Sequence, residues 1–161
     1  YGEIRPIYTT DAYRVEGNSG AQWRTVHLGT DVWTSAGTPV FSPLDGVIHS
    51  FQNNAADRDY GPTIILKHET HDVVFYTLYG HLSLDSINDL KIGQSFKEGD
   101  CIGKLGDASI NGDYPPHLHF QMIKDLQKFE GDYPGVSSKM NLAFFVKNCP
   151  DPNLLLKLSD K

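Results

Sequence analysis

Long hydrophobic segments, clustered basic residues and abundant cysteine are all missing from this 161-residue sequence. No apolar run approaches the roughly 18 residues that a membrane-spanning helix needs, so no transmembrane segment is predicted. Acidic residues outnumber basic ones, and the formal net charge is -6. Because nucleic-acid binders need a basic surface to displace counterions, a DNA or RNA partner is not expected.

No signal peptide is recognised at the beginning of the sequence. Tyr1–Thr10 has no apolar core segment of a signal peptide. The first residue is not Met, which suggests a processed protein or an excised domain. The two cysteines, Cys101 and Cys149, lie in no CxxC pair and beside no histidine. Two buried free thiols are therefore expected. One disulfide between the two cysteines remains the alternative.

Short segments rich in Val, Ile, Tyr, Phe and Thr alternate with turn signals such as Asn111-Gly112-Asp113. The expected strands are Pro39–Phe41, Gly46–Phe51, Thr63–Lys67, Val73–Tyr79, Cys101–Leu105 and His117–Ile123. Short strands with frequent turns predict a mainly β domain built on antiparallel sheet, sandwich-like, with few short helices.

The whole chain, residues 1–161, is expected to form a single domain. Its core should span about residues 22–123, and residues 124–161 should be a C-terminal extension or linker. Single helical turns are expected at Leu84–Leu90, Asn141–Asn148 and Asn153–Leu158. Phe129–Lys139 has the composition of a loop, and the last ten residues fit either a linker or a terminal helix.

The first candidate site motif is His27-Leu28-Gly29-Thr30-Asp31. Imidazole nitrogen and carboxylate oxygen are both good zinc ligands, at roughly 2.0–2.2 Å. On a straight strand the ends of this motif would lie about 13 Å apart, too far to share one ion. The chain therefore has to turn between them, which the conformational freedom of Gly29 permits. Taken alone, the motif also fits a surface histidine followed by a turn aspartate.

The second motif is His117-Leu118-His119-Phe120. Alternate residues of a strand point to the same face, so both imidazoles would face one site while Leu118 and Phe120 face the core. Two histidines on one face of an apolar strand are costly unless a metal, a hydrogen bond or chemistry satisfies them. The alternative is a pair of structural histidines.

The third motif is Tyr79-Gly80-His81-Leu82-Ser83, in which His81 follows the expected strand Val73–Tyr79 near the rim of a sheet. Alone, it fits a structural histidine just as well. Three further histidines lie outside the motifs: His49, His68 and His71. The last two lie in a polar, hairpin-like stretch, so solvated side chains are expected there.

In this order, HxGxD, YGHLS and HLHF resemble the motifs of the lysostaphin-type, LytM-like zinc metallopeptidases. The resemblance runs from about Gln22 to Met122. It includes Gly37–Ile48, which is similar to the strand–turn–strand that follows the first ligands in the family. It also includes Ile92–Gly103, which is similar to the segment before the final HxH. The resemblance implies the lysostaphin-type fold, a β domain with the duplicated hybrid motif.

The resemblance also implies a role for each motif residue. His27, Asp31 and His119 would bind Zn²⁺, and His117 and His81 would be the catalytic residues beside it. Three protein ligands leave one position open for water, whose pKa zinc lowers to roughly 7. A neighbouring imidazole titrates near neutral pH and can accept the proton of that water and pass it to the leaving amine.

The loop Asp107–Pro116 departs from the family, in which a Gly/Ser/Thr-rich loop precedes the final HxH. This loop should border the substrate groove, so a changed substrate preference is expected. Some relatives use a Tyr just ahead of the first His to stabilise the oxyanion. The nearest aromatic residues here are Trp23 and, farther back, Tyr13, so that role is not transferred.

Longer phrases resemble one branch of the family, in which this domain lies between a phosphotransferase-like and a class III aminotransferase-like domain. They are Trp23–His27, Tyr60–Leu66, Pro115–Phe120 and the tail Cys149–Leu154. On that resemblance the chain would be an excised middle domain with flanking domains, in the cytoplasm. Otherwise a periplasmic or secreted protein is expected.

The expected function is a bacterial zinc metalloendopeptidase that hydrolyses peptidoglycan-type cross-link peptides. The alternative is a non-catalytic, zinc-containing module that binds a peptide or regulates a larger multidomain enzyme. Relatives of that kind typically lose site residues, whereas all five positions are present here. A phosphocarrier domain also uses paired histidines, but it would not need Asp31.

Overall fold

The computed structural model describes residues 1–6, 8, 10–17 and 20–158, which form mainly antiparallel β-structure. The strands are β1 (Arg14–Gly17), β2 (Gly20–His27), β3 (Thr30–Trp33), β4 (Pro39–Phe41), β5 (Gly46–Asn54), β6 (Gly61–Thr70), β7 (Val73–Gly80), β8 (Ser95–Phe96), β9 (Cys101–Lys104), β10 (His117–Ile123) and β11 (Val136–Ser138). The helices are α1 (Leu142–Asn148) and α2 (Asn153–Leu156), with single 3-10 turns η1 (Asp11–Tyr13) and η2 (Leu84–Ile87).

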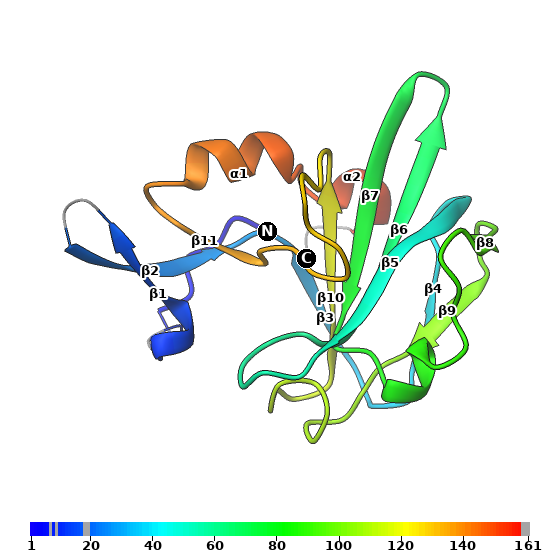
Figure 1. Ribbon diagram of the computed structural model, residues 1–161, viewed down its shortest axis with the longest axis horizontal. Coiled ribbons are helices and arrows are strands. Elements are labelled where there is room, and N and C mark those ends of the chain that lie inside the picture. The colour runs from blue at the N-terminus through cyan, green and yellow to red at the C-terminus, as the bar shows by residue number, and fades with distance from the viewer. Residues whose placement is uncertain (7, 9, 18–19, 159–161) are drawn as a thin grey trace.

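The strands form one large sheet and two small ones (Figure 1). The six-stranded sheet has the order β3-β10-β7-β6-β5-β8, and each pairing within it is antiparallel. A three-stranded sheet, β1-β2-β11, extends from it, and β4 pairs with β9. The expected antiparallel fold class is confirmed.

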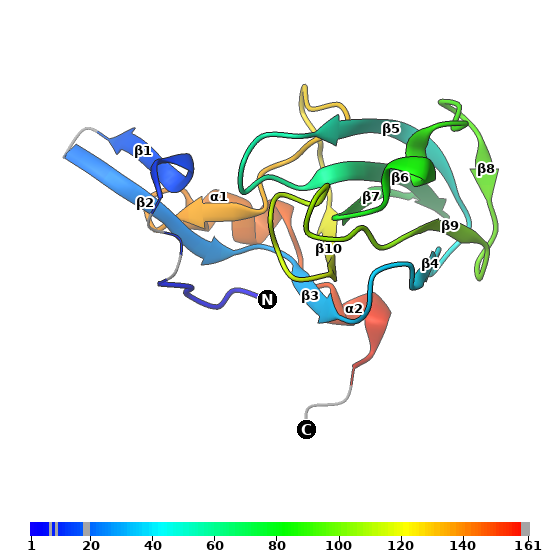
Figure 2. The same ribbon diagram turned by 90° about the horizontal axis from the view of Figure 1, so that it is seen from below.

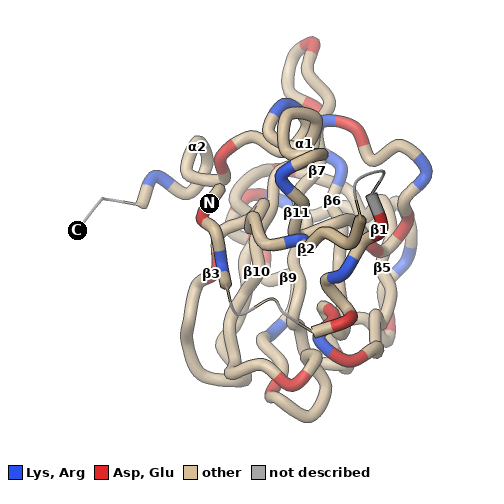
Figure 3. The backbone as a smooth tube through the Cα atoms, turned by 90° about the vertical axis from the view of Figure 1, so that its left-hand side faces the viewer, with Lys and Arg blue, Asp and Glu red and all other residues tan. Residues whose placement is uncertain are grey.

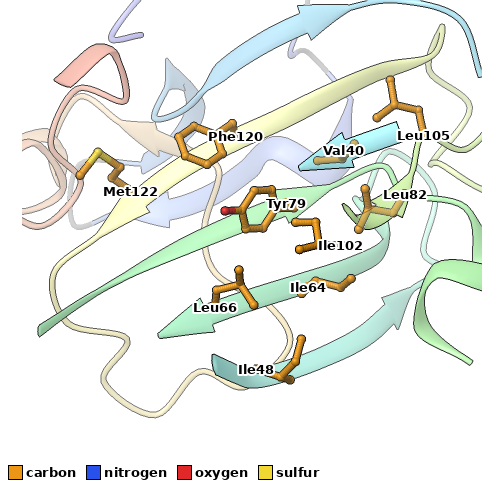
Figure 4. Close-up of a cluster of buried hydrophobic side chains, with 10 residues drawn as sticks. All are labelled: Val40, Ile48, Ile64, Leu66, Tyr79, Leu82, Ile102, Leu105, Phe120 and Met122. Atoms are coloured by element: carbon orange, nitrogen blue, oxygen red, sulfur yellow. The ribbon is translucent and has the colours of Figure 1, made fainter. Parts of the chain in front are cut away.

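One face of the large sheet packs against the β4–β9 pair to form the main core (Figure 4). Its ten buried side chains are Val40, Ile48, Ile64, Leu66, Tyr79, Leu82, Ile102, Leu105, Phe120 and Met122. Phe120 and Met122 alternate along β10 with His119 and Gln121, whose side chains therefore point to the opposite face. The expected division of β10 into a core face and a histidine face is confirmed.

Residues that follow β10 cover the opposite face of the large sheet. Ile65 and Ile123 of the sheet pack there in a second buried cluster with Tyr133 and Cys149. Both faces of β6 are thus buried, which explains why its sequence is a continuous apolar run and not an alternating one. The segment after residue 124 is therefore packed against the same sheet as the histidine motifs.

Each of the six expected strands is present, and Pro39–Phe41 and His117–Ile123 have the expected limits. The expectation of a loop over Phe129–Lys139 was wrong in part. Val136–Ser138 is β11, because it pairs with the edge of β2. Of the last ten residues, Asn153–Leu156 form the short helix α2.

Residues of both charge signs are interspersed along the backbone in the view of Figure 3. Within the described residues, no helix is long and apolar enough to cross a membrane. The two cysteines are free, and Cys149 is fully buried as expected. Cys101, in contrast, is exposed, because it lies on β9 with its side chain away from the core.

Candidate metal and catalytic site

Three of the motif residues converge although they come from three strands. His27 ends β2, Asp31 lies on β3, and His119 lies opposite Asp31 in the β10–β3 register. His27 Nε2 is 3.0 Å from His119 Nδ1 and 3.3 Å from Asp31 Oδ1. His119 Nδ1 is 3.1 Å from Asp31 Oδ1. One atom of each residue therefore points to a common centre, and all three residues could hold a metal ion together.

The close approach of β2, β3 and β10 depends on Gly29. The chain passes from one sheet to the next through Leu28 and Gly29, which shortens the distance between His27 and Asp31 as the motif requires. A Cβ atom on Gly29 would lie 2.5 Å from Cε1 of His119. The backbone of Gly29 is not in the positive-φ region. The glycine is needed here for the space that it leaves to His119 and not for a special backbone conformation.

The outer nitrogen of each ligand histidine faces an oxygen. His119 Nε2 donates to Oε1 of Gln121 at 2.9 Å. The amide nitrogen of Gln121 donates to the carbonyl of Pro134 at 3.1 Å and to the sulfur of Cys149 at 3.3 Å, which fixes the orientation of the amide. His27 Nδ1 lies 3.0 Å from Glu3 Oε1. With protons on these outer nitrogens, the inner nitrogens present lone pairs to Asp31.

These donors fit a tetrahedral zinc site. Zinc bonds of roughly 2.0–2.1 Å place tetrahedral ligand atoms about 3.3 Å apart. The three distances between the inner atoms of His27, Asp31 and His119 are 3.0, 3.1 and 3.3 Å. Two lone pairs and a carboxylate oxygen at this spacing repel one another unless a cation lies between them. The set therefore suits a metal ion with one open position.

His81 and His117 stand beside this centre, with ring centroids 4.2 Å apart. His81 Nδ1 donates to the carbonyl of Asn111 at 2.9 Å, and His117 Nδ1 donates to the carbonyl of Pro115 at 2.8 Å. Both acceptors belong to the loop before β10. Because Nδ1 carries the proton in each ring, Nε2 is the free basic atom. The Nε2 atom of His117 is 3.9 Å from Asp31 Oδ2.

Burial favours the neutral form of three of the site histidines. Burial lowers the pKa of His81 to about 3, and the neighbouring His117 adds to the shift. Burial also lowers the pKa values of His117 and His27. At Asp31 burial opposes ionisation, but the close imidazoles of His119 and His27 outweigh it and hold the carboxyl pKa well below its usual range. The site thus combines an ionised carboxylate with imidazoles of which His27, His81 and His117 favour the neutral form.

The five motif residues all line one cavity of about 730 Å³. Its walls carry aromatic rings from segments far apart in the sequence, namely Tyr8, Tyr13, Trp33, Tyr60, Tyr114, Phe129 and Tyr133. Tyr114 comes from the loop Asp107–Pro116 and meets the rings of His81 and His117 edge-on. A cavity of this size can admit a short stretch of peptide.

Sequence reasoning missed several residues of this site. Trp33 stacks on His117, and Arg5 donates to Asp31 Oδ2 at 2.5 Å. Neither is part of a recognisable motif. Gln121 lies two residues beyond His119 on the same strand face, and that spacing could have identified it.

The histidines outside the motifs do not line the cavity. His71 is exposed as expected. The expectation that His68 is solvated was wrong, because its side chain is fully buried. His68 Nδ1 donates to the carbonyl of Asp45 at 2.8 Å, and Nε2 accepts from the hydroxyl of Thr77 at 2.7 Å. Two hydrogen bonds to the sheet therefore replace water around this ring.

The fold and site define a small antiparallel β protein with a two-histidine, one-carboxylate metal-binding cluster in an aromatic cavity. Peptidase family M23 matches residues 25–130. The chain therefore belongs to peptidase family M23.

Two characterised peptidases and one solved structure illustrate the relationship. The chain is 30% identical over 135 residues to the L-Ala--D-Glu endopeptidase of Bacillus subtilis, covering 80% of this chain and 39% of that protein. It is 31% identical over 98 residues to the peptidoglycan DD-endopeptidase ShyC of Vibrio cholerae, covering 60% of this chain and 20% of that protein. The chain thus spans about two fifths or less of either relative.

The catalytic domain of the antimicrobial peptidase lysostaphin from Staphylococcus simulans superposes with a TM-score of 0.51. It is 27% identical, and the match covers 90% of this chain and 89% of that one. The structural match therefore includes parts of this chain on both sides of residues 25–130. For those parts it shows a similar fold and no more.

Proposed function

We propose that this protein is a zinc metalloendopeptidase that hydrolyses peptide bonds in peptidoglycan-type cross-link peptides. The observation that carries the proposal is the convergence of His27, Asp31 and His119 beside two further histidines in one cavity. Membership in peptidase family M23 supports a peptidase. The peptidoglycan endopeptidases among its relatives support the substrate class.

His27 Nε2, His119 Nδ1 and Asp31 Oδ1 would hold the ion. Bound there, zinc would polarise the scissile carbonyl and lower the pKa of a water to about 7. The donor set favours zinc over magnesium or calcium, since two imidazole nitrogens suit zinc whereas those ions prefer oxygen ligands.

His81 and His117 would carry out the proton transfers. Each donates its Nδ1 proton to a loop carbonyl and so keeps Nε2 free. A neutral Nε2 can accept a proton from the attacking water and return it to the leaving amine. Once protonated, the second imidazole can stabilise the negative charge that develops on the carbonyl oxygen. Because the two rings lie side by side, the two tasks can be divided between them.

Cleavage of muropeptides and of pentaglycine, with and without a chelator, tests the proposal. Wild-type protein should cleave at least one of these substrates, and the chelator should abolish cleavage until zinc is restored. His117→Ala and His81→Ala should each lower kcat by about 100- to 10,000-fold while one zinc per chain is retained. His71→Ala, at an exposed position away from the cavity, is the matched control and should retain full activity.

Zinc binding without turnover of any peptide would overturn the catalytic proposal and favour a peptide-binding module. Failure to bind zinc would overturn the metal assignment as well. Undiminished hydrolysis in His117→Ala would remove that residue from the proton transfers. Because the chain spans only part of its relatives, flanking domains in the full protein are proposed as partners that select the substrate.

A further inference from the structure

The segment before β1 is joined to the strand that carries the first ligand. The amide of Gly2 donates to the carbonyl of His27 at 2.9 Å, and the amide of His27 donates to the carbonyl of Glu3 at 3.0 Å. The amide of Arg5 donates to the carbonyl of Thr25 at 2.8 Å. Figure 2 shows the segment beside β2. These residues thus extend the edge of the small sheet toward the metal-binding cluster.

Antiparallel pairing decides which side chains of this segment face the cluster. Ile4 forms a β-bridge with Val26, so Glu3 lies opposite His27. Side chains of paired residues lie on the same face of a sheet, and residues i and i+2 share a face. Glu3 and Arg5 therefore point toward the ligands, whereas Ile4 points away and is exposed.

Glu3 and Arg5 connect two ligands that lie on different strands. Glu3 Oε1 is 3.0 Å from His27 Nδ1 and accepts from Nε of Arg5 at 2.8 Å. Arg5 Nη1 donates to Asp31 Oδ2 at 2.5 Å and to the hydroxyl of Tyr8 at 3.0 Å. The other oxygen of Asp31, Oδ1, faces His27 and His119. One oxygen of Asp31 thus binds Arg5, and the other faces the centre of the metal-binding cluster.

We propose that Glu3 and Arg5 are positioning residues that orient His27 and Asp31 for metal binding, Glu3 by placing its carboxylate beside Nδ1 of His27, where it favours the proton on that nitrogen, and Arg5 by holding Asp31 to a single ligand oxygen. The proposal rests on the function proposed above. Glu3 and Arg5 precede residues 25–130, the segment that the family model matches, so these two contacts with the ligands come from outside that segment.

Two features of the pair suit this role. Glu3 balances the charge of Arg5, so the pair orients the ligands without adding net charge beside the cation. The Nδ1 atom of His27 is buried and makes no hydrogen bond among the described residues, and the carboxylate of Glu3 is the charged group beside it, with Oε1 at 3.0 Å. Without Glu3, either ring nitrogen of His27 could carry the proton, and the tautomer with Nε2–H cannot bind a metal through Nε2.

The chain offers a matched control pair. Arg14 and Glu16 have the same residue types and the same spacing, and they form an exposed ion pair of 2.9 Å on β1. Neither lines the cavity. Arg14→Gln and Glu16→Gln therefore remove the same charges without touching a ligand.

The test measures the zinc dissociation constant by competition with a chelating dye for Arg5→Gln, Glu3→Gln and the two controls. Removal of a partner of a ligand typically weakens metal affinity about 10- to 100-fold. We expect this increase for Arg5→Gln and Glu3→Gln and no change for the controls. Arg5→Lys should recover part of the affinity, because Lys keeps the charge but cannot bridge Glu3 and Asp31 as the guanidinium does.

The visible spectrum of the Co²⁺-substituted protein gives a readout that a general loss of stability would not move. Four-coordinate cobalt absorbs more strongly than five- or six-coordinate cobalt. If Arg5 holds Asp31 to one oxygen, Arg5→Gln should weaken the absorption, since both carboxylate oxygens can then bind. Melting of the metal-free proteins shows whether each variant is folded.

Zinc dissociation constants and cobalt spectra that match those of the controls in folded variants would overturn the inference and leave the proposed function intact. Absence of zinc binding in the wild-type protein would instead remove the proposed function itself. Unfolding of the metal-free variants would also overturn the positioning role of Glu3 and Arg5, since the pair would then be needed for folding and not for orienting the ligands.

Discussion

The indole ring of Trp33 stacks on the imidazole of His117, with ring centroids 4.2 Å apart and planes inclined by 24°. The two residues are directly opposite in the β10–β3 register, so the stack is built into the strand pairing. Trp33 is 57% exposed and lines the cavity. An exposed indole in this position limits the rotation of His117 and also forms part of the wall that a substrate meets.

Trp33→Ala should lower kcat/KM for peptide cleavage, because the stack holds the His117 ring in place. An aromatic pair of this kind stabilises the stacked arrangement by about 0.5–1.5 kcal/mol. That energy corresponds to a loss of roughly 2- to 12-fold. Trp33→Phe should keep most of the activity, and zinc content should not change. Trp23→Ala is the control, since Trp23 is also exposed but does not line the cavity. Equal activities in Trp33→Ala and Trp23→Ala would contradict the role.

Gln121→Leu should raise the zinc dissociation constant about 10- to 100-fold, because it removes the acceptor at 2.9 Å for the outer proton of His119 and leaves the hydroxyl of Tyr60 at 3.4 Å. Gln121→Glu keeps an acceptor oxygen and should bind zinc more tightly than the leucine variant. Competition with a chelator measures both values. Gln52→Leu, at an exposed glutamine on β5, should bind zinc as the wild type does. Tight zinc binding by Gln121→Leu would show that His119 needs no such partner.

The five motif residues could be found from sequence because their chemistry is local. HxH on a strand places two imidazoles on one face, and β10 confirms that geometry. Glu3 and Arg5 could not be found in this way. Their position beside the ligands depends on the pairing of residues 2–5 with β2. Such a contact between separate segments cannot be predicted from the alternation of polar and apolar residues.

The fold was predictable where burial is strong and not where a strand lies at an edge. β6 and β10 are apolar runs and were expected. β1 and β11 lie at the two edges of their small sheet, consist largely of polar residues, and are each paired with β2 between them. His68 was misjudged for a related reason, since its polar sequence neighbours are exposed while the ring itself turns inward to Asp45 and Thr77.

Gly29→Ala should weaken zinc binding and also lower the free energy of unfolding by about 1–3 kcal/mol, the usual cost of overpacking. The added methyl would press on the ring of His119 and on the carbonyl of Phe120, 2.8 Å away. Urea unfolding and chelator competition measure the two effects. Gly93→Ala separates them, because Gly93 has a positive φ but open space around it. That variant should lose stability and keep its zinc affinity.

Cys101 should react with a thiol reagent in the native protein, whereas Cys149 should not. Cys101 is exposed, and burial raises the pKa of the Cys149 thiol to about 11. Titration should therefore detect one thiol in buffer and two in denaturant. Cys101→Ser should leave no reactive thiol in buffer. Absence of free thiols in denaturant would mean that the two cysteines pair, contrary to the structure.

His68 should make the stability of the metal-free protein depend on pH. Burial lowers its pKa below the value of 6.5 that it has in an unfolded chain. As the pH falls below about 6.5, the unfolded state takes up a proton that the folded state refuses, so the free energy of unfolding decreases toward acid pH. Above that pH both states leave His68 neutral, and its contribution is constant.

His68→Gln should therefore reduce the slope of unfolding free energy against pH between about pH 6.5 and 5, by up to roughly 1.4 kcal/mol per pH unit. The variant should also be less stable at pH 7.5, because the hydrogen bonds to Asp45 and Thr77 are disturbed. Urea denaturation at several pH values measures both effects. His71→Gln, on the exposed turn between β6 and β7, should leave the slope unchanged. An unchanged slope in His68→Gln would mean that its ring is protonated as readily in the folded protein as in the unfolded chain.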